Sequence, residues 1–477
     1  MNLSFQSELR VRSVVENLVK ATALLLVAGR FAVGSMQAQI VQAVESTIYS
    51  FIPANPTNGV LEARLIVGSD GALYGVGSPG DSTFGGAVFK INRDGSGYQV
   101  LHNFGSITND GLLASATKTY DDALLLGSDN ALYGTTSIGG ANGDGIIYRI
   151  TEDGSDYRIL HSFDNSQNDR FPITGVIQAA SGVLYGTTAF EGPINEPAAV
   201  FSINPDGSDY TVLTNISYSA AALLQGQDGA LYGTTTLSNQ IFRINLDGSG
   251  LTILHTFSGT DGSAPIGQLI QSVNGFLLGA TWLGGTSNFG TLFMISTNGD
   301  DFQVLHNFSD GEVSGDGQIP HAGLALGPGN LFYGTTSLGG TYGYGTVFKI
   351  NQDGSGYEQL YSFPPSGQPE SGLVQGQSQG NPGVLYGTAG GVGSSGAGFI
   401  YAILVNPPLS ITPVTTQTAS NQVTVSWPAW ALNYVLQSTT NLSSSNWVNV
   451  SNGVPVTGVQ LTNPANPGTF YRLVAPN

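Results

Sequence analysis

The chain contains no cysteine and few basic residues. Disulfide bonds, cysteine metal sites and thiol catalysis are therefore excluded in its 477 residues. Lys and Arg number 14 against 32 Asp and Glu, which gives a net charge of −18. No basic run lies beyond the first 30 residues, so the chain lacks the electrostatic footprint of a nucleic-acid binder and we expect no such partner.

Long hydrophobic runs are also missing, apart from one near the N-terminus. Basic residues precede the apolar run Ala21–Gly29, and small residues follow it. This order is typical of an export signal, which we place at residues 1–38; the alternative is a poorly ordered N-terminal helix. No other run approaches the roughly 18 apolar residues that span a bilayer. We expect an exported bacterial protein, secreted or at the cell surface, with no transmembrane segment in the mature chain.

Glycine is abundant, with 67 residues, and much of it belongs to a repeat. The element "LYG", or a close variant, recurs every 46 to 59 residues. Its seven closing glycines are Gly75, Gly134, Gly186, Gly233, Gly279, Gly334 and Gly387. Such a period is typical of propeller blades or solenoid units.

Four strands are predicted in each copy of the repeat. In the fourth copy they are residues 221–226, 230–235, 240–245 and 251–257, which are rich in residues that favour strands. Asp-Gly or Asn-Gly pairs separate the first strand from the second and the third from the fourth, as tight hairpin turns require. Each copy is therefore predicted to be a four-stranded antiparallel meander.

The ends of the repeat region favour a closed ring over a linear stack. A meander that is apolar on both faces needs a neighbour on each side. The seventh copy stops after three strands, whereas the orphan segment "STIYSF" at residues 46–51 matches a fourth strand. We predict that this segment pairs with residues 397–404 and closes a seven-bladed β-propeller over residues 39–405.

The recurring pattern "LYGTTSxGGxxGxGTVFKINxDGSGYxxLHxF" resembles the GloVer tandem repeat, found in choice-of-anchor bacterial surface proteins. The resemblance covers roughly residues 46–404; copies three and four depart from it in the loop between strands two and three. It implies export and a propeller. It implies no activity, so no catalytic residue is carried over.

A second domain is predicted at residues 406–477, after a Pro-rich junction. Apolar and polar residues alternate in "QVTVSW" and "NYVLQS", and "FYRLVA" comes late. Together with Trp427 and Tyr434, this resembles a small fibronectin type III or immunoglobulin-like β-sandwich, although about 70 residues is short for that fold.

Three sets of polar residues recur at equivalent positions of the repeat and are candidate sites. Four histidines occupy one position of the repeat, where other copies have Thr214 and Tyr361: His102, His161, His255 and His306. A position that accepts His, Thr and Tyr indicates a structural role.

The turn aspartates Asp94, Asp153, Asp206, Asp247 and Asp353 supply one carboxylate each, so we expect no metal site at these turns. The exception is the cluster of Glu152, Asp153 and Asp156, where a weak calcium site on the surface remains an alternative. Four glutamines at the innermost strand are predicted to line the channel and to hold either a polar ligand or water and backbone groups: Gln178, Gln225, Gln271 and Gln375.

The loops between strands two and three and between blades are predicted to emerge on one face. They carry aromatic rings beside Asn and Asp, which suits saccharide recognition; the alternative is that the rings pack their own loops. The candidate ligand-binding residues there are Phe84, Asp144, Trp282, Phe289, Tyr342 and Tyr344.

Three functions remain open from the sequence. The favoured one is a monomeric surface or secreted module that binds a glycan or a surface protein. The second is a structural surface protein docked by its C-terminal sandwich. The third is a polysaccharide hydrolase or lyase with carboxylates at the channel mouth, although no catalytic motif or cofactor signature is present.

Overall fold

The computed structural model describes the chain in segments. They are residues 23–25, 44–51, 64–77, 85–113, 124–164, 166, 169–172, 174–188, 198–216, 222–309, 311, 313–365, 367–369, 371–376, 383–390 and 398–405, then 410–414, 422–426, 435–439, 448–449, 458–462 and 470–474. Among them no helix is long and apolar enough to cross a membrane.

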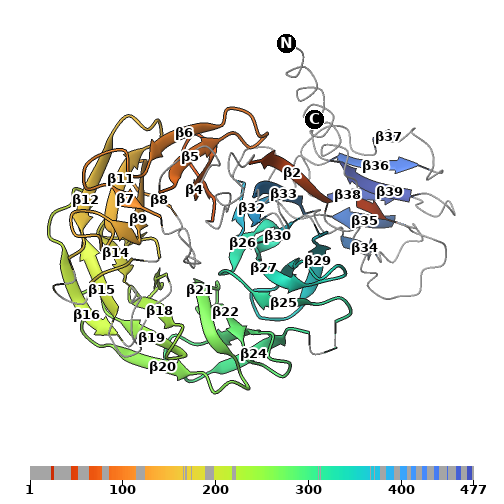
Figure 1. Ribbon diagram of the computed structural model, residues 1–477. Helices are drawn as coiled ribbons and strands as arrows, with labels where there is room; N and C mark the ends of the chain where they lie inside the picture. Colours follow the sequence, from red (N-terminus) through yellow and green to blue (C-terminus); the bar gives the residue numbers. More distant parts are fainter. Residues whose placement is uncertain are drawn as a thin grey trace, which may run out of the picture.

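Seven four-stranded antiparallel blades form a ring, as the sequence predicted (Figure 1). Blades one to three contain β3 (Ile66–Val67), β4 (Leu73–Gly77), β5 (Ala87–Ile91) and β6 (Gln99–Asn103); β8 (Leu125–Leu126), β9 (Ala131–Thr136), β11 (Ile146–Thr151) and β12 (Tyr157–Ser162); and β13 (Ile177–Gln178), β14 (Leu184–Thr187), β15 (Ala198–Ile203) and β16 (Thr211–Ile216). Blades four and five contain β17 (Leu224–Gln225), β18 (Leu231–Thr235), β19 (Gln240–Ile244) and β20 (Thr252–Thr256); and β21 (Ser263–Gln271), β22 (Leu277–Leu283), β23 (Thr291–Ile295) and β24 (Phe302–Asn307). Blade six contains β26 (Ala325–Gly327), β27 (Leu331–Gly339), β28 (Thr346–Ile350) and β29 (Glu358–Ser362), with the short helical turn η1 (Pro328–Asn330) between its first two strands.

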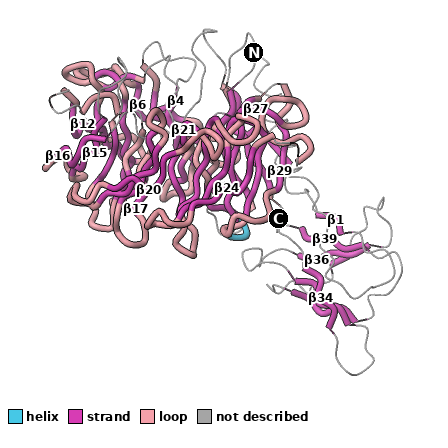
Figure 2. Tube along the Cα trace, turned by 90° about the horizontal axis from the view of Figure 1, so that it is seen from below, coloured by secondary structure: helices cyan, strands magenta, loops and turns pink. Residues whose placement is uncertain are grey.

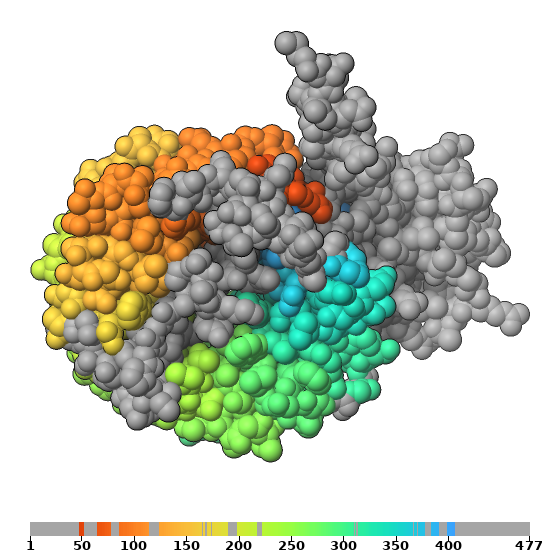
Figure 3. Space-filling view, viewed as in Figure 1, coloured from red at the N-terminus to blue at the C-terminus, as the bar shows by residue number. Residues whose placement is uncertain are grey.

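The seventh blade joins the two ends of the ring. It contains β31 (Val374–Gln375), β32 (Val384–Gly390) and β33 (Phe399–Leu404), and β2 (Val44–Ser50) is its outermost strand. β2 runs antiparallel to β33, with Ser50 opposite Phe399 and Val44 opposite Leu404. In Figure 3 the red atoms of the N-terminal strand accordingly lie close to the blue ones. The predicted closure by residues 46–51 is confirmed.

Short accessory strands lie where the linkers enter a blade. β7 (Gly111–Leu112) pairs with β10 (Ile138–Gly139), β25 (Gly317–Pro320) with β27, and β30 (Gln368–Pro369) with β32. The innermost strand of blade four is shorter than predicted: only Leu224–Gln225 pairs, where residues 221–226 were expected. Leu223, inside that expected strand, is instead buried in the core between blades three and four.

A glycine opposite an aromatic ring defines the two middle strands of every blade. The closing glycine of "LYG" is the cross-strand partner of a Phe or Tyr, as in Gly75 with Phe89 and Gly387 with Tyr401. A Cβ at either glycine would overlap that ring. The glycine is therefore required by packing, since the ring lies flat over the space that a side chain would fill.

The outermost strand of every blade carries a β-bulge. In blade two, Ile147 is opposite His161 and Tyr148 is opposite Ile159, so Leu160 is the extra residue. Equivalent shifts leave Ile48, Leu101, Leu213, Leu254, Leu305 and Leu360 as the extra residues. A bulge places two residues against one and increases the local twist. β2 also carries this bulge, so it has the same local structure as the outermost strands of the six other blades.

Six of the seven bulged residues, all but Leu360, lie against the turn glycine of the next blade. A Cβ on Gly154 would lie within 3.2 Å of Leu101, and one on Gly207 would lie 3.0 Å from the Leu160 carbonyl oxygen. These two glycines also have positive φ, 75° and 90°. Glycine is thus required in the Asp-Gly turn for two reasons: it adopts a positive φ without strain, and it lets the preceding blade approach closely.

Among the described residues of the ring, the buried side chains form seven hydrophobic clusters, one at each boundary between blades. The cluster between blades seven and one includes Phe51, Leu65 and Ile400, and so joins the two ends of the ring. Every blade therefore has both faces covered.

Six strands follow the ring, and they form sheets of their own (Figure 2). β34 (Ser410–Val414), β35 (Gln422–Ser426) and β38 (Gly458–Thr462) form one sheet; β36 (Val435–Thr439), β37 (Val448–Asn449) and β39 (Phe470–Val474) form another with β1 (Ala23–Leu25).

Closure can be tested with a disulfide, since the native chain has no cysteine to compete. Direct neighbours on antiparallel strands have Cα atoms about 4.5–5.5 Å apart, within the range that a disulfide bridges. We expect Ser50→Cys with Phe399→Cys to form a bond, detected as a linked peptide by mass spectrometry. The control pair, Ser50→Cys with Ala402→Cys, is out of register and should keep both thiols. Free thiols in both pairs would contradict the closed ring.

Candidate functional site

The central channel contains a cavity of about 250 Å³ where the innermost strands begin. Its wall comes from all blades but the sixth: Arg64, Leu65, Ile66, Leu124, Leu125, Leu126, Gly175, Val176, Ile177, Ala222, Gln268 and Val374. The linkers between blades arrive at this end of the strands. In an antiparallel meander the loops between strands two and three lie at the same end, so the cavity opens on the predicted loop-bearing face. The turn η1, between first and second strands, projects from the opposite rim (Figure 2).

Two rings of equivalent residues surround the channel at this end, and each contributes four residues to the cavity wall. The inner ring contains one residue from the innermost strand of each blade, namely the cross-strand partner of the Tyr of "LYG" or its equivalent. These residues are Ile66, Leu125, Ile177, Leu224, Ile270, Ala325 and Val374. All seven are apolar, and all but Ala325 are half-buried. Two residues earlier lies the mouth ring: Arg64, Ala123, Gly175, Ala222, Gln268, Gly323 and Gly372. Ala123 lies outside the described residues.

Arg64 and Gln268 are the two long polar side chains of the mouth ring. The Cδ of Arg64 lies 3.5 Å from where a Cβ on Gly372 would be, so its aliphatic part lies over the start of blade seven. Gln268 Nε2 donates a hydrogen bond of 2.6 Å to the carbonyl of Leu223 in blade four. The residues described as lining the cavity include no Asp, Glu or His.

The channel glutamines make hydrogen bonds to backbone groups. Gln225 Oε1 accepts one from the amide of Ala180 in the preceding blade at 2.9 Å, and its Nε2 donates one to Gly229 of its own turn at 3.3 Å. Gln178 and Gln271 make the same pair of bonds, accepting from Ser128 and Gln227. Gln375, at the corresponding place in β31, is half-buried. Of the two roles that the sequence left open, the contacts of these three amides match the structural one.

Two other boundaries have a similar hydrogen bond, in which a side chain from the turn between the third and fourth strands accepts from a backbone amide of the preceding blade. Glu152 Oε1 accepts from the amide of Ser69 in blade one, and Gln352 Oε1 accepts from that of Val273 in blade five. Five consecutive boundaries, from blades one and two to blades five and six, are thus bridged on the rim opposite the cavity mouth.

The histidines belong to a repeated contact between blades. His306 of blade five stacks on Tyr357 of blade six, with ring centroids 3.7 Å apart. Its Nε2 lies 2.8 Å from Asp316, a buried linker residue that also accepts a 2.6 Å bond from the Tyr357 hydroxyl. His102, Asp110 and Tyr157 repeat this triad between blades one and two.

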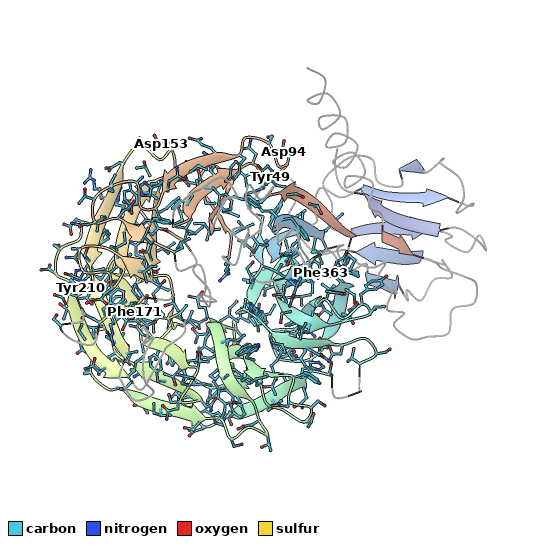
Figure 4. All side chains as sticks on the ribbon, viewed as in Figure 1. Tyr49, Asp94, Asp153, Phe171, Tyr210 and Phe363 are labelled. Carbon is cyan, nitrogen blue, oxygen red and sulfur yellow. The ribbon has the colours of Figure 1, made fainter. Side chains whose placement is uncertain are left out.

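Two further boundaries carry partial versions of the triad. His255 stacks on Phe302 and pairs with Asp261, whereas His161 stacks on Tyr210. Tyr210, labelled on the outer margin of the ring in Figure 4, donates its own bond to Asp169. The histidines thus lie at separate boundaries, as the interpretation of their slot as structural requires.

Burial and hydrogen bonds act in opposite directions on the linker aspartates. Burial raises the pKa of Asp316, but hydrogen bonds from His306, Tyr357 and the amide of Ser309 outweigh it and keep that pKa below its usual value. Burial lowers the pKa of His161, because charging an imidazole costs more away from water, and the nearby charges of Asp169 and Asp164 offset this only in part.

The turn aspartates bond to the serine two residues later. Asp94 accepts from the amide and hydroxyl of Ser96, and the other four turns repeat this with their own serines. Hydrogen bonds from Thr151 and Ser155 lower the pKa of Asp153 to about 2. Near it, Asp156 pairs with Arg149 and Arg158. No group of three His, Asp or Glu side chains suited to a metal occurs among the described residues.

The six candidates on the loop-bearing face differ in exposure. Phe84 lies outside the described residues, and Asp144 and Trp282 are half-buried. Phe289 packs against the core between blades five and six, and Tyr344 against the core between blades six and seven. Tyr342 is 58% exposed. Of the four described aromatic residues, Tyr342 and Trp282 are therefore the better placed to reach a ligand.

Arg64 and the linker aspartates were missed as site residues from the sequence. The signal for Arg64 was a basic residue where the other copies have Ala, Gly or Gln. Asp110 and Asp316 follow their histidines by 8 and 10 residues, so no fixed spacing marks the pair.

These features define the chain as a seven-bladed β-propeller built from tandem repeats, with a cavity at one end of its channel. Residues 35–240 and 220–416 match the Gloeobacter/Verrucomicrobia repeat family. The chain belongs to that family.

The chain also resembles enzymes, at low identity. It is 27% identical over 171 residues to lactonase drp35 from Staphylococcus haemolyticus, a match that covers 36% of this chain and 48% of the lactonase. The chain thus spans about half the length of that curated relative. A streptogramin B lyase structure has a TM-score of 0.50 at 14% identity, covering 76% of this chain and 98% of that one. A catalytically inactive virginiamycin B lyase from Staphylococcus aureus with quinupristin has a TM-score of 0.51 at 16% identity, covering 76% and 100%. These structures share the fold alone.

The glutamine bridges can be tested by substitution. Leucine occupies the position of Gln271 in two other blades, so Gln271→Leu should fit while removing both hydrogen bonds. We expect the free energy of unfolding to fall by about 1 kcal/mol in urea denaturation. Gln303→Leu, on an exposed position of the same blade, should change it little. Equal effects of the two variants would contradict the bridging role.

The Asp316 triad predicts a pH dependence. Because the folded-state pKa of Asp316 is lowered, its ionised form stabilises the fold above about pH 4, and this contribution is lost as the pH falls through the lowered value. Asp316→Asn should cost about 1–3 kcal/mol at pH 7 and make the loss of stability below pH 4 less steep. Asp300→Asn, at an exposed turn, is the control for stability at pH 7. An unchanged acid profile in Asp316→Asn would contradict the prediction.

Proposed function

We propose that the protein is an exported binding protein, secreted or at the cell surface, that takes its ligand on the loop-bearing face at the channel mouth. The observation that carries this proposal is the cavity of about 250 Å³ on that face. Its wall is mostly apolar, with a few polar groups at the rim, which is the usual composition of a ligand site. Export rests on the N-terminal signal expected from the sequence.

Binding is favoured over catalysis by the chemistry of the wall. A hydrolase or lyase needs a group that gives or takes a proton near the substrate, most often His, Asp or Glu. The residues described around the cavity include none of these. The names of the lactonase and lyase relatives are therefore not extended to this chain.

We further propose that the C-terminal strands form the small sandwich expected from the sequence and that it attaches the propeller to a surface or to a neighbouring protein. In support, β34–β39 divide between two sheets, as a sandwich requires. This role is compatible with ligand binding by the ring.

A saccharide or a surface protein remains the expected kind of partner for the loop-bearing face. Tyr342 offers an exposed ring, and Trp282 is half-buried near the end of β22 in blade five. Aromatic faces bind the C–H faces of sugars.

A glycan array of the full chain tests the saccharide form of the proposal. We expect a subset of glycans to bind, with the signal reduced at least tenfold by Tyr342→Ala or Trp282→Ala. Leu237→Ala removes an apolar side chain that is 60% exposed in blade four and should leave the signal unchanged. No binding above background would exclude the saccharide form, and equal loss in all three variants would argue against these two aromatic residues.

A further inference from the structure

The seven-fold ring at the channel mouth contains one cation. Arg64 is half-buried, and no described residue makes an ion pair or hydrogen bond with its side chain. At the equivalent position the other blades have Ala, Gly or Gln. Five of these six residues are Ala or Gly, so packing at this position does not require an arginine.

The position of Arg64 makes the charge costly without an anion. Its side chain borders a cavity whose wall includes Leu65, Leu125 and Ile177. Partial burial beside apolar side chains removes water from a charged group and raises its free energy unless a counter-charge is present. A carboxylate would supply that counter-charge and accept two parallel N–H bonds from the guanidinium, the strongest common form of such a contact.

The remainder of the wall defines the body of the ligand. Deeper in the channel than Arg64, residues of the inner ring such as Ile66 and Val374 place branched apolar side chains along the cavity wall. Gly175 and Ala222, which line the cavity together with Arg64, carry no large side chain. Gln268 already donates to the carbonyl of Leu223, so it is a neutral part of the rim.

We propose that the channel mouth binds an organic carboxylate with an apolar body, the carboxylate on Arg64 and the body against the inner ring. This inference rests on the proposed function and names a ligand class for the cavity itself, separate from the partner expected for the aromatic residues of the loops. The net charge of −18 disfavours anions at long range, so selectivity for the carboxylate depends on Arg64 at short range.

Calorimetric titration of the full chain with matched probes tests the proposal. Octanoate is compared with octanol and octyltrimethylammonium, which share its alkyl body; galacturonate is compared with galactose, so that an alkyl acid and a sugar acid are distinguished. We expect octanoate to bind at least tenfold more tightly than octanol, whereas a preference for galacturonate over galactose alone would contradict the apolar body. If neither carboxylate binds better than its neutral partner, the proposal is wrong.

Variants of the mouth ring assign the selectivity to Arg64. Arg64→Gln should weaken carboxylate binding at least tenfold and leave the neutral probe unchanged, whereas Arg64→Lys should keep part of the preference. Arg158→Gln removes an arginine that is 65% exposed on the outer strand β12 and should have no effect. Ala222→Arg added to Arg64→Gln returns a cation to the ring and should restore the preference. Unchanged carboxylate binding in Arg64→Gln would overturn the assignment.

The two proposals fail in different ways. Ile177→Trp fills the channel below the mouth and should abolish all probe binding. If octanol and octanoate bind equally to the native chain and both are lost in this variant, the cavity is a ligand site without selectivity for anions. If no probe and no glycan binds, the proposed function fails together with the inference.

Discussion

Each blade is apolar on both faces, and this constraint governs the rest of the structure. A sheet of this kind is stable only when a neighbour covers each face, so an open stack would leave two apolar faces in water. The ring removes both ends by pairing β2 with β33 and by burying Phe51 and Ile400 in one cluster. The repeated features follow from the same need: Gly75 lets Phe89 lie flat within its blade, and Gly154 lets Leu101 of the preceding blade approach its turn.

Much of this architecture could be predicted from the sequence because its signals are periodic and local. The glycine spacing indicated the seven blades, and the orphan segment at residues 46–51 indicated the closure. Strands two to four of blade four lie within a residue or two of their predicted bounds. What could not be predicted depends on distance in the folded ring. Gly75 and Phe89 were both visible in the sequence, but their contact follows from cross-strand register, and the Asp316–Tyr357 bond spans a linker of variable length.

The candidate site shows the same limit more strongly. Variable loops with aromatic residues suggested a ligand face, yet a sequence does not say which ring points outward. Phe289 and Tyr344 pack against the cores of their own boundaries, whereas Tyr342, two residues before Tyr344, is exposed. Arg64 was overlooked for a different reason: it precedes a strand of two residues, and its place at the channel mouth exists only once seven blades close.

Departures from symmetry are informative in a ring of repeats. A residue type that most copies share, such as the "LYG" glycine, is explained by packing that every blade has in common. A residue that occurs in one copy and not in the other six, such as Arg64 in the mouth ring, is explained by a role particular to that blade. The side-chain bridges strengthen this reading, because Gln178, Gln225 and Gln271 join consecutive blades on the opposite rim. A scaffold fastened in this way holds the strands around the channel at fixed positions. The backbone that carries Arg64 belongs to this scaffold, so a ligand that binds the guanidinium has to order the side chain but not the strand.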